Sequence, residues 1–228
     1  MFIEPSMKWI ENDFHAYSFD LFQISVIAFR DNFEVIYDPT QSQSVQQIIG
    51  HFKYRCLVNG SFFEWSGQHA GWLSVLGNHF TPLKQDRQLT HVAILNSLTS
   101  EVTFLEAESW EPSLSSETNI EFQTGPLVLQ ANQLDEASIQ CSINGLRSHR
   151  RTLLAFTHED GLKYFITVRE PERLDILGRH LLKLSIFEAK KLSVINLDGG
   201  PSVALTSRIT PKLNYNEDAI LPILLALK

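Results

Sequence analysis

Two short polar segments of this 228-residue chain contain the residue types of a reactive site. Residues 194–202 read Val-Ile-Asn-Leu-Asp-Gly-Gly-Pro-Ser, so an apolar run rich in β-forming residues ends on a carboxylate, two glycines and a hydroxyl. Residues 57–64 read Leu-Val-Asn-Gly-Ser-Phe-Phe-Glu and have a similar order: an apolar run, a polar turn, then aromatic residues and a carboxylate. Each segment predicts a strand that ends on a tight turn, and we expect the two turns to share one pocket.

The Asp-Gly-Gly sequence at 198–200 has two interpretations. It forms either an ordinary β-turn or a turn whose glycines let the backbone approach a ligand and bind an anion through N–H groups. In the second interpretation Asp198 is a nucleophile, a base or a charge stabiliser, and Ser202 binds the ligand or caps the next segment. Ser202 does not fit a serine-hydrolase motif, because Ala204 stands where Gly-x-Ser-x-Gly has its second glycine.

The second polar segment is also open to two interpretations. Asn59 and Gly60 are typical of a type I′ hairpin turn. The aromatic side chains of Phe62 and Phe63 favour a ligand pocket, because aromatic faces stack on sugars and bases. Glu64 is either an acid–base group whose pKa is raised by apolar surroundings or a side chain that points to solvent.

Two adjacent arginines, Arg150 and Arg151, precede Thr152 at the start of a predicted hairpin. Neighbouring residues of a strand point to opposite faces, so at most one of these arginines faces a pocket. The alternatives are a solvated pair and a bidentate clamp for phosphate or carboxylate.

The elements that must position these groups predict an α+β fold: a single domain of mixed or antiparallel sheet with two or three packed helices. We assign residues 1–16 to an N-terminal extension and residues 17–228 to the domain. The patterns predict two strands within 17–37, a helix after a capping box at Ser44, a hairpin of 151–157 with 163–168, helices at 171–182 and 185–191, and an exposed loop at 106–119.

Composition and charge exclude several classes of protein. Hydrophobic residues make up 43% and charged residues 20% of the chain, as in a soluble globular protein. The net charge of −7 argues against non-specific binding to nucleic acid or to anionic membranes. The apolar tail at 219–227 is too short to span a bilayer. Residues 1–12 lack a signal-peptide pattern, so we expect a cytoplasmic protein by default.

The cysteine pattern indicates no metal site. Cys56 and Cys141 allow one disulfide, but two buried free thiols are the favoured interpretation. No spacing typical of a zinc or calcium site is present. We therefore expect no cofactor, with a divalent cation held by oxygens of Asp198, Glu64 and Glu159 as the alternative.

Four segments taken together resemble the phosphodiester glycosidase family. They are Asn-Gly-Ser-Phe-Phe at 59–63, Gly-Pro at 125–126, Arg-Thr at 151–152 and Asn-Leu-Asp-Gly-Gly-Pro-Ser at 196–202, and they occur in the family's order. The resemblance spans about residues 17–205. Ser61 and Pro201 depart from the family pattern, because each replaces a usual glycine.

The resemblance implies a hydrolase that cleaves a sugar from a sugar-1-phosphate diester in a glycan or envelope polymer. A phosphate that leaves the anomeric carbon needs less general-acid help than an ordinary alcohol does. The implied partner is a sugar-phosphate diester or a phosphorylated glycan. Two alternatives remain: a binding module that has lost catalysis, motivated by Ser61 and Pro201, and a partner-binding protein in which both turns are purely structural.

The resemblance also implies roles for individual residues. Asp198 is the expected nucleophile or base, Arg151 the phosphate ligand, Asn59 an orienting group and Glu64 the reserve acid–base. The expected substrate-binding residues are Gly60, Phe62, Phe63, Gly125, Thr152, Asn196, Gly199, Gly200 and Ser202.

Overall fold

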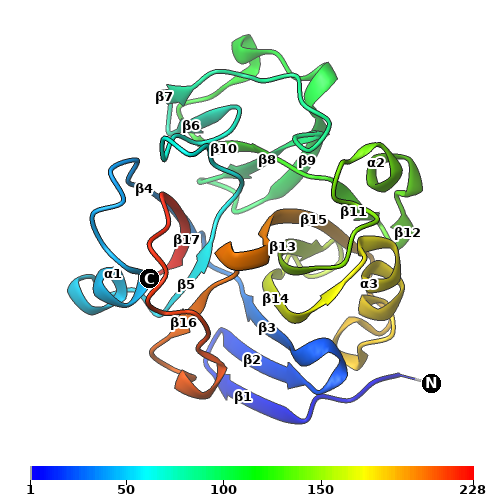
Figure 1. The fold of residues 1–228 in the computed structure, drawn as a ribbon. Coiled ribbons are helices and arrows are strands. Elements are labelled where there is room, and N and C mark those ends of the chain that lie inside the picture. Colours follow the sequence, from blue (N-terminus) through cyan, green and yellow to red (C-terminus); the bar gives the residue numbers. More distant parts are fainter. Residues whose placement is uncertain (1) are drawn as a thin grey trace.

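The computed structural model describes residues 2–228, in which three sheets and three α-helices form the fold (Figure 1). Sheet is the main component, which confirms the predicted α+β class. Within each of the three sheets, all neighbouring strands of the described chain run antiparallel.

The largest sheet has eight strands and carries part of the candidate site. Its order is β1 (Met7–Glu11), β2 (Phe14–Phe19), β3 (Ile24–Phe29), β14 (Lys163–Glu172), β13 (His149–Thr157), β15 (Leu192–Gly199), β11 (Leu127–Gln130) and β12 (Gln133–Leu134). β1 and the start of β2 lie within residues 1–16, the range assigned to an N-terminal extension. Both strands belong to this sheet, so residues 1–16 and 17–228 share one sheet.

Two smaller sheets complete the strand structure. One has five strands in the order β7 (Asn78–Thr81), β6 (Leu73–Val75), β10 (Asn119–Thr124), β8 (His91–Asn96) and β9 (Val102–Glu106). The other has four strands in the order β16 (Leu205–Ser207), β5 (Cys56–Asn59), β17 (Ile223–Leu227) and β4 (Glu34–Tyr37).

Side-chain alternation along the central strands separates two cores. On β13, Leu153 and Ala155 pack with α3 (Leu174–Leu181) and α2 (Glu136–Cys141) on one face of the eight-stranded sheet. Leu154, between them, faces the opposite way into the core that all three sheets share. Burial on both faces holds the ends of β13 and β15 in place, and these ends carry the candidate site.

The first helix begins where its capping box predicts. In α1 (Val45–His51) the Gln47 N–H donates to the Ser44 hydroxyl at 3.2 Å, and the Ser44 N–H donates to the Gln47 side chain at 2.8 Å. The helix ends at His51, because Phe52 is extended and Cys56 pairs with strands β16 and β17.

Other local predictions have mixed outcomes. The hairpin of β13 and β14 is confirmed. The helix expected at 185–191 is only a 3₁₀ turn, Ser185–Phe187, because the backbone leaves the helical region at Glu188 (ψ of 134°) and Ala189 has a φ of +57°. Both cysteines are free thiols; Cys56 is buried as expected, whereas Cys141 is exposed. Across residues 2–228, no helix combines the length and the apolar character needed to cross a membrane.

Candidate functional site

The two polar turns meet at the end of the central strands (Figure 1). The main-chain N–H of Asp198 donates to the Gly60 carbonyl at 3.1 Å. In return, the Asn59 side chain donates from Nδ2 to the Asp198 carbonyl at 2.9 Å. Two segments separated by about 140 positions are thus joined by reciprocal hydrogen bonds. These two hydrogen bonds fix the position of the aspartate turn relative to the asparagine turn.

Asn59 connects three strands through a single buried side chain. Its Oδ1 accepts a hydrogen bond from the Thr152 hydroxyl at 2.5 Å and another from the Ala204 N–H at 3.1 Å. The residue is only 1% exposed, so each of these groups depends on the others for its hydrogen bonds. Asn59 and Thr152 therefore position the backbone of the site and are not free to bind a ligand through these atoms.

Asp198 is the group in this cluster best suited to chemistry. Burial raises the pKa of its carboxyl to about 6; the Ser202 hydroxyl, the Gly199 N–H and the Arg151 charge oppose that rise. The Gly199 N–H donates to Oδ1 at 2.8 Å. A carboxyl with a pKa near 6 is mostly ionised at neutral pH yet remains basic enough to accept a proton.

Arg151 lies opposite Gly199 in the pairing of β13 with β15. Its Nη2 donates to the carbonyls of Asn144 and Arg147, both at 2.7 Å. Its Nε is buried and has no hydrogen-bond partner within residues 2–228. Burial lowers the pKa of this guanidinium to about 10, and the charge of Asp198 opposes that shift. The side chain is thus held by the loop before β13, with donor capacity left over.

Asn196 ties the aspartate strand to the Gly125–Pro126 turn. Its Nδ2 donates to the Gly125 carbonyl at 2.9 Å, and its own carbonyl accepts from the Thr124 hydroxyl at 2.8 Å. A Cβ on Gly125 would lie 2.4 Å from the Thr90 hydroxyl oxygen, and the φ of Gly125 is +148°, so glycine is required there. The Asn196 Oδ1 is buried without a hydrogen-bond partner within residues 2–228.

The glycines of the aspartate turn serve different purposes. A Cβ on Gly199 would lie 2.6 Å from the Arg150 carbonyl oxygen, so glycine lets β13 and β15 approach each other. Gly200 has no atom within 4 Å of its Cβ position but has a φ of +61°. Glycine is needed at position 199 because β13 and β15 approach each other closely there, and at position 200 because the backbone has a positive φ.

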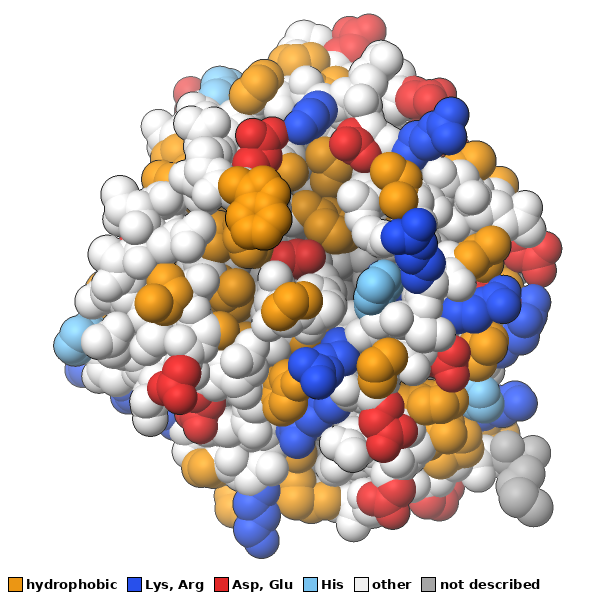
Figure 2. Space-filling model, viewed as in Figure 1, with side chains coloured by type: hydrophobic (Ala, Val, Ile, Leu, Met, Phe, Trp, Pro, Cys, Tyr) orange, Lys and Arg blue, Asp and Glu red, His pale blue; other side chains and the backbone are white. Residues whose placement is uncertain are grey.

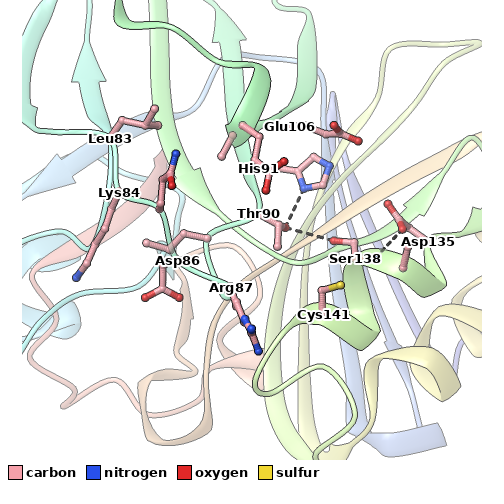
Figure 3. Close-up of a pocket in the computed structure, with 15 residues that line it drawn as sticks. Leu83, Lys84, Asp86, Arg87, Thr90, His91, Glu106, Asp135, Ser138 and Cys141 are labelled. Carbon is pink, nitrogen blue, oxygen red and sulfur yellow. Dashed lines mark hydrogen bonds between the residues drawn. The ribbon is translucent and has the colours of Figure 1, made fainter.

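A cavity of about 650 Å³ lies between the loop before β8, the end of β9 and α2 (Figure 3), and neither Asp198 nor Arg151 is among the residues that line it. Thr90, which touches Gly125, lies in its wall with His91 and Ser138. The Thr90 hydroxyl lies 2.8 Å from His91 Nδ1 and 3.3 Å from the Ser138 hydroxyl. The rim carries charges of both signs, which come from Lys84, Asp86, Arg87, Glu106 and Asp135. Neutral hydroxyl and imidazole groups in a cavity of this size suit a polar organic ligand.

Some of the expected site residues lie apart from the Asp198 cluster. Glu64 forms an exposed ion pair with Lys84 at 2.8 Å, and its side chain is 48% exposed. Phe63 packs on the core of α1, and its backbone forms an isolated bridge with His69. Phe62 is half-buried in the same loop. Of these aromatic and acidic residues, none has a hydrogen bond to Asp198 in the described chain.

Sequence patterns missed a buried pair, Ser61 and His69. The Ser61 hydroxyl hydrogen-bonds to His69 Nε2, while Nδ1 donates to the Gly71 carbonyl at 3.0 Å. Burial lowers the pKa of His69 to about 4, so the ring is neutral and its Nε2 accepts a hydrogen bond from the Ser61 hydroxyl. Both residues are almost fully buried, so this pair holds the loop that follows Gly60. No local motif announces it, because the spacing of eight residues is specific to this loop.

A metal site is not apparent in the described chain. Within residues 2–228, no group of three or more His, Cys, Asp or Glu side chains is arranged to hold a metal ion. Asp198, Glu64 and Glu159 accordingly do not form a cluster of that kind.

Comparisons with solved structures find the same fold in distant proteins. One is the zebrafish N-acetylglucosamine-1-phosphodiester alpha-N-acetylglucosaminidase catalytic domain auto-inhibited by its pro-peptide, with a TM-score of 0.64 and 14% identity over 97% of this chain and 80% of that chain. A Synechocystis protein has a TM-score of 0.57 and 11% identity, over 96% of this chain and 60% of that chain. A protein from Burkholderia pseudomallei K96243 has a TM-score of 0.53 and 10% identity, over 94% of this chain and 74% of that chain.

The sequence comparisons add no relative. No family model and no curated protein matches this chain. At identities of 10–14%, the structural similarity establishes the fold alone. The chain therefore shares its fold with the catalytic domain of a glycosidase, among other proteins.

Proposed function

We propose that this protein is a hydrolase that cleaves a sugar from a sugar-1-phosphate diester. The observation that carries the proposal is the convergence of Asp198, Arg151 and the Asn59–Gly60 turn. A carboxyl and a guanidinium next to a glycine-rich turn are the groups that such a reaction requires. The fold shared with a glycosidase that acts on an N-acetylglucosamine-1-phosphodiester supports the same reaction class.

In the proposed reaction, Asp198 attacks the anomeric carbon or activates water for that attack. Its pKa of about 6 leaves it ionised at neutral pH and able to stabilise positive charge that develops on the sugar. Arg151 balances the negative charge of the leaving phosphate, aided by the Gly200 N–H, because the Gly199 N–H already donates to Asp198. The phosphate leaves as an anion, so no strong general acid is needed, which agrees with the position of Glu64 in an exposed ion pair.

The cavity whose wall includes Thr90, the neighbour of Gly125, is the proposed binding site for a further sugar unit of the substrate, since Asp198 does not line it. Its volume of about 650 Å³ lies in the range of small-molecule pockets. The hydroxyls of Thr90 and Ser138 and the imidazole of His91 offer hydrogen bonds to sugar hydroxyls without adding charge.

The decisive experiment measures release of free sugar from methyl diesters of glucose 1-phosphate and N-acetylglucosamine 1-phosphate. We expect turnover by the wild type, and a loss of about 1,000-fold or more in Asp198→Asn, as for removal of a reacting group. Asp218→Asn, an exposed aspartate variant, is the matched control and should retain activity. Equal turnover by Asp198→Asn and the wild type would remove Asp198 from the reaction.

A binding module for phosphorylated glycans is the second candidate. It is favoured by the Arg151 hydrogen bonds to two backbone carbonyls and by the lack, within residues 2–228, of a second carboxyl hydrogen-bonded to the cluster. Saturable binding of both diesters without any product after long incubation would support it over the hydrolase.

A further inference from the structure

A second group of basic residues flanks the aspartate turn on the face opposite Arg151. Arg150 and Arg169 both lie over the ring of Tyr215, with guanidinium carbons 5.9 and 5.2 Å from the ring centroid. We call these three residues the basic stack. Both cations interact with the same aromatic ring, and each interaction is weakly favourable.

The basic stack has no acidic partner in the described chain. Among residues 2–228, no carboxylate oxygen lies within 4 Å of the Arg150 or Arg169 guanidinium. Two like charges held together without a counter-charge attract an anion from solution.

The two arginines are held in different ways. Arg169 is anchored, because its Nη2 donates to the Leu213 carbonyl at 2.5 Å and to the Ser25 hydroxyl at 3.3 Å, while its buried Nε has no partner within residues 2–228. Arg150 is exposed, and its side chain makes no hydrogen bond within the same residues. One fixed and one free guanidinium can close on a bound group from two sides.

The stack is joined directly to the aspartate turn. The Arg150 carbonyl lies 2.6 Å from the Cβ position of Gly199. On the other side, Tyr215 pairs with Leu205 through two backbone hydrogen bonds, of 2.8 and 3.0 Å. Its neighbour Asn216 donates to the carbonyl of Pro201 at 2.9 Å. These contacts hold the basic stack next to the turn that carries Asp198.

Figure 2 shows one face of the molecule, on which Lys and Arg side chains lie below and to the right of a central hollow. We infer that the basic stack binds a second anionic group of the substrate, so that the natural ligand is a chain of sugar-phosphate units with several phosphodiesters. This inference deepens the proposed function and rests on it for the identity of the substrate. A single phosphodiester would leave Arg150 and Arg169 without a counter-charge.

The test uses an oligomer of five glycerol phosphate units, which has five phosphates but no sugar–phosphate bond to cleave. Calorimetric titration at low salt should detect binding to the wild-type protein. Arg150→Gln should weaken that binding at least about tenfold, the loss expected for one charge-assisted contact. Arg150→Lys, which keeps the charge, should weaken it less. Arg179→Gln, an exposed arginine variant on α3, should stay within about twofold of the wild type.

The outcomes separate this inference from the hydrolase proposal, because binding of this oligomer does not require turnover. Equal affinity of Arg150→Gln and wild type, with unchanged melting temperatures, would overturn the basic stack as a binding site, whatever the activity toward diesters. Tighter binding of a thymidine pentanucleotide than of the glycerol phosphate oligomer would overturn the assignment to a glycan chain. Selective binding of the oligomer through Arg150 would support it even in an inactive Asp198→Asn protein.

Discussion

The side chain of Asn59 donates a hydrogen bond to the main-chain carbonyl of Asp198, 2.9 Å away and on a different sheet. This contact joins the four-stranded sheet to the eight-stranded sheet at the point where strands β5 and β15 end. The reactive carboxyl is thus positioned by an amide that has no free atom for a ligand. The chemistry of Asp198 and the stability of the fold are coupled through this residue.

Replacing Asn59 should therefore lower the free energy of unfolding. Asn59→Ala leaves the Thr152 hydroxyl and the Ala204 N–H buried without an acceptor, at a cost of about 2–4 kcal/mol. Thr152→Val removes one donor and keeps the other, so its cost should be about 1 kcal/mol. Urea unfolding at pH 7 measures both values. A loss in Asn59→Ala no larger than in Thr152→Val would contradict this account.

The two glycines of the turn should respond differently to alanine. Gly199→Ala places a methyl 2.6 Å from a backbone oxygen and should destabilise the fold by about 2–3 kcal/mol, because the strands must separate. Gly200→Ala meets no atom within 4 Å and should cost only about 1 kcal/mol for its positive φ. Thermal unfolding of the two variants compares them directly, and a reversed order would refute the close-approach explanation.

Activity, once measured on a diester, should depend on the ionisation of Asp198. Burial raises the pKa of this carboxyl to about 6, and the ionised form is the reactive one. We therefore expect kcat/KM to fall about tenfold per pH unit below pH 6 and to level off above pH 7. A flat profile from pH 5 to pH 8 would argue against Asp198 as nucleophile or base.

The same carboxyl should make the fold more stable as the pH falls. The pKa of Asp198 is about 6 in the folded protein, above the ordinary value of 3.8, so the folded state binds the proton more tightly than the unfolded chain. Its contribution should raise the free energy of unfolding by about 1 kcal/mol between pH 7 and pH 5. Asp198→Asn should lack this part of the pH dependence. Identical pH dependence in both proteins would show that the pKa is not raised.

His69 should make the fold less stable as the pH falls over the same range. Its pKa of about 4 lies below the ordinary value of 6.5, so the unfolded chain takes up the proton first. This favours unfolding by about 2 kcal/mol between pH 7 and pH 5. His69→Gln keeps an acceptor for the Ser61 hydroxyl and should remove that pH dependence. Denaturation curves of the variant and the wild type that shift equally with pH would contradict the low pKa.

The local features of this fold could be predicted from short stretches of sequence. The Ser44 and Gln47 capping box starts α1, because a cap involves groups only three residues apart. The hairpin of β13 and β14 follows from two apolar runs and an Asp-Gly turn between them. The short helix expected after Ser185 does not form: the Ser185 N–H pairs with the carbonyl of the distant residue Ile3, and the backbone leaves the helical region at Glu188.

The candidate site shows the same division between local and distant causes. Sequence alone predicted site roles for Asn59, Gly199 and Asp198, because a strand that ends on glycines and polar residues is a local pattern. Their union depended on pairing of strands far apart in the chain, which is set by the packing of three sheets around shared cores. The partners of Arg151 and of Glu64 likewise come from loops that no local pattern connects.

Sequence by itself determined the fold class and the residue types at the two turns, since these follow from hydrophobic periodicity and turn chemistry. Only the tertiary structure decided which charges are paired, which are buried and which remain uncompensated. The reason is physical: a pKa or an unpaired arginine depends on every group within a few ångströms, and most of those groups here come from elsewhere in the chain. The ion pair that holds Glu64 and the stack that leaves Arg150 unpaired are both consequences of that packing.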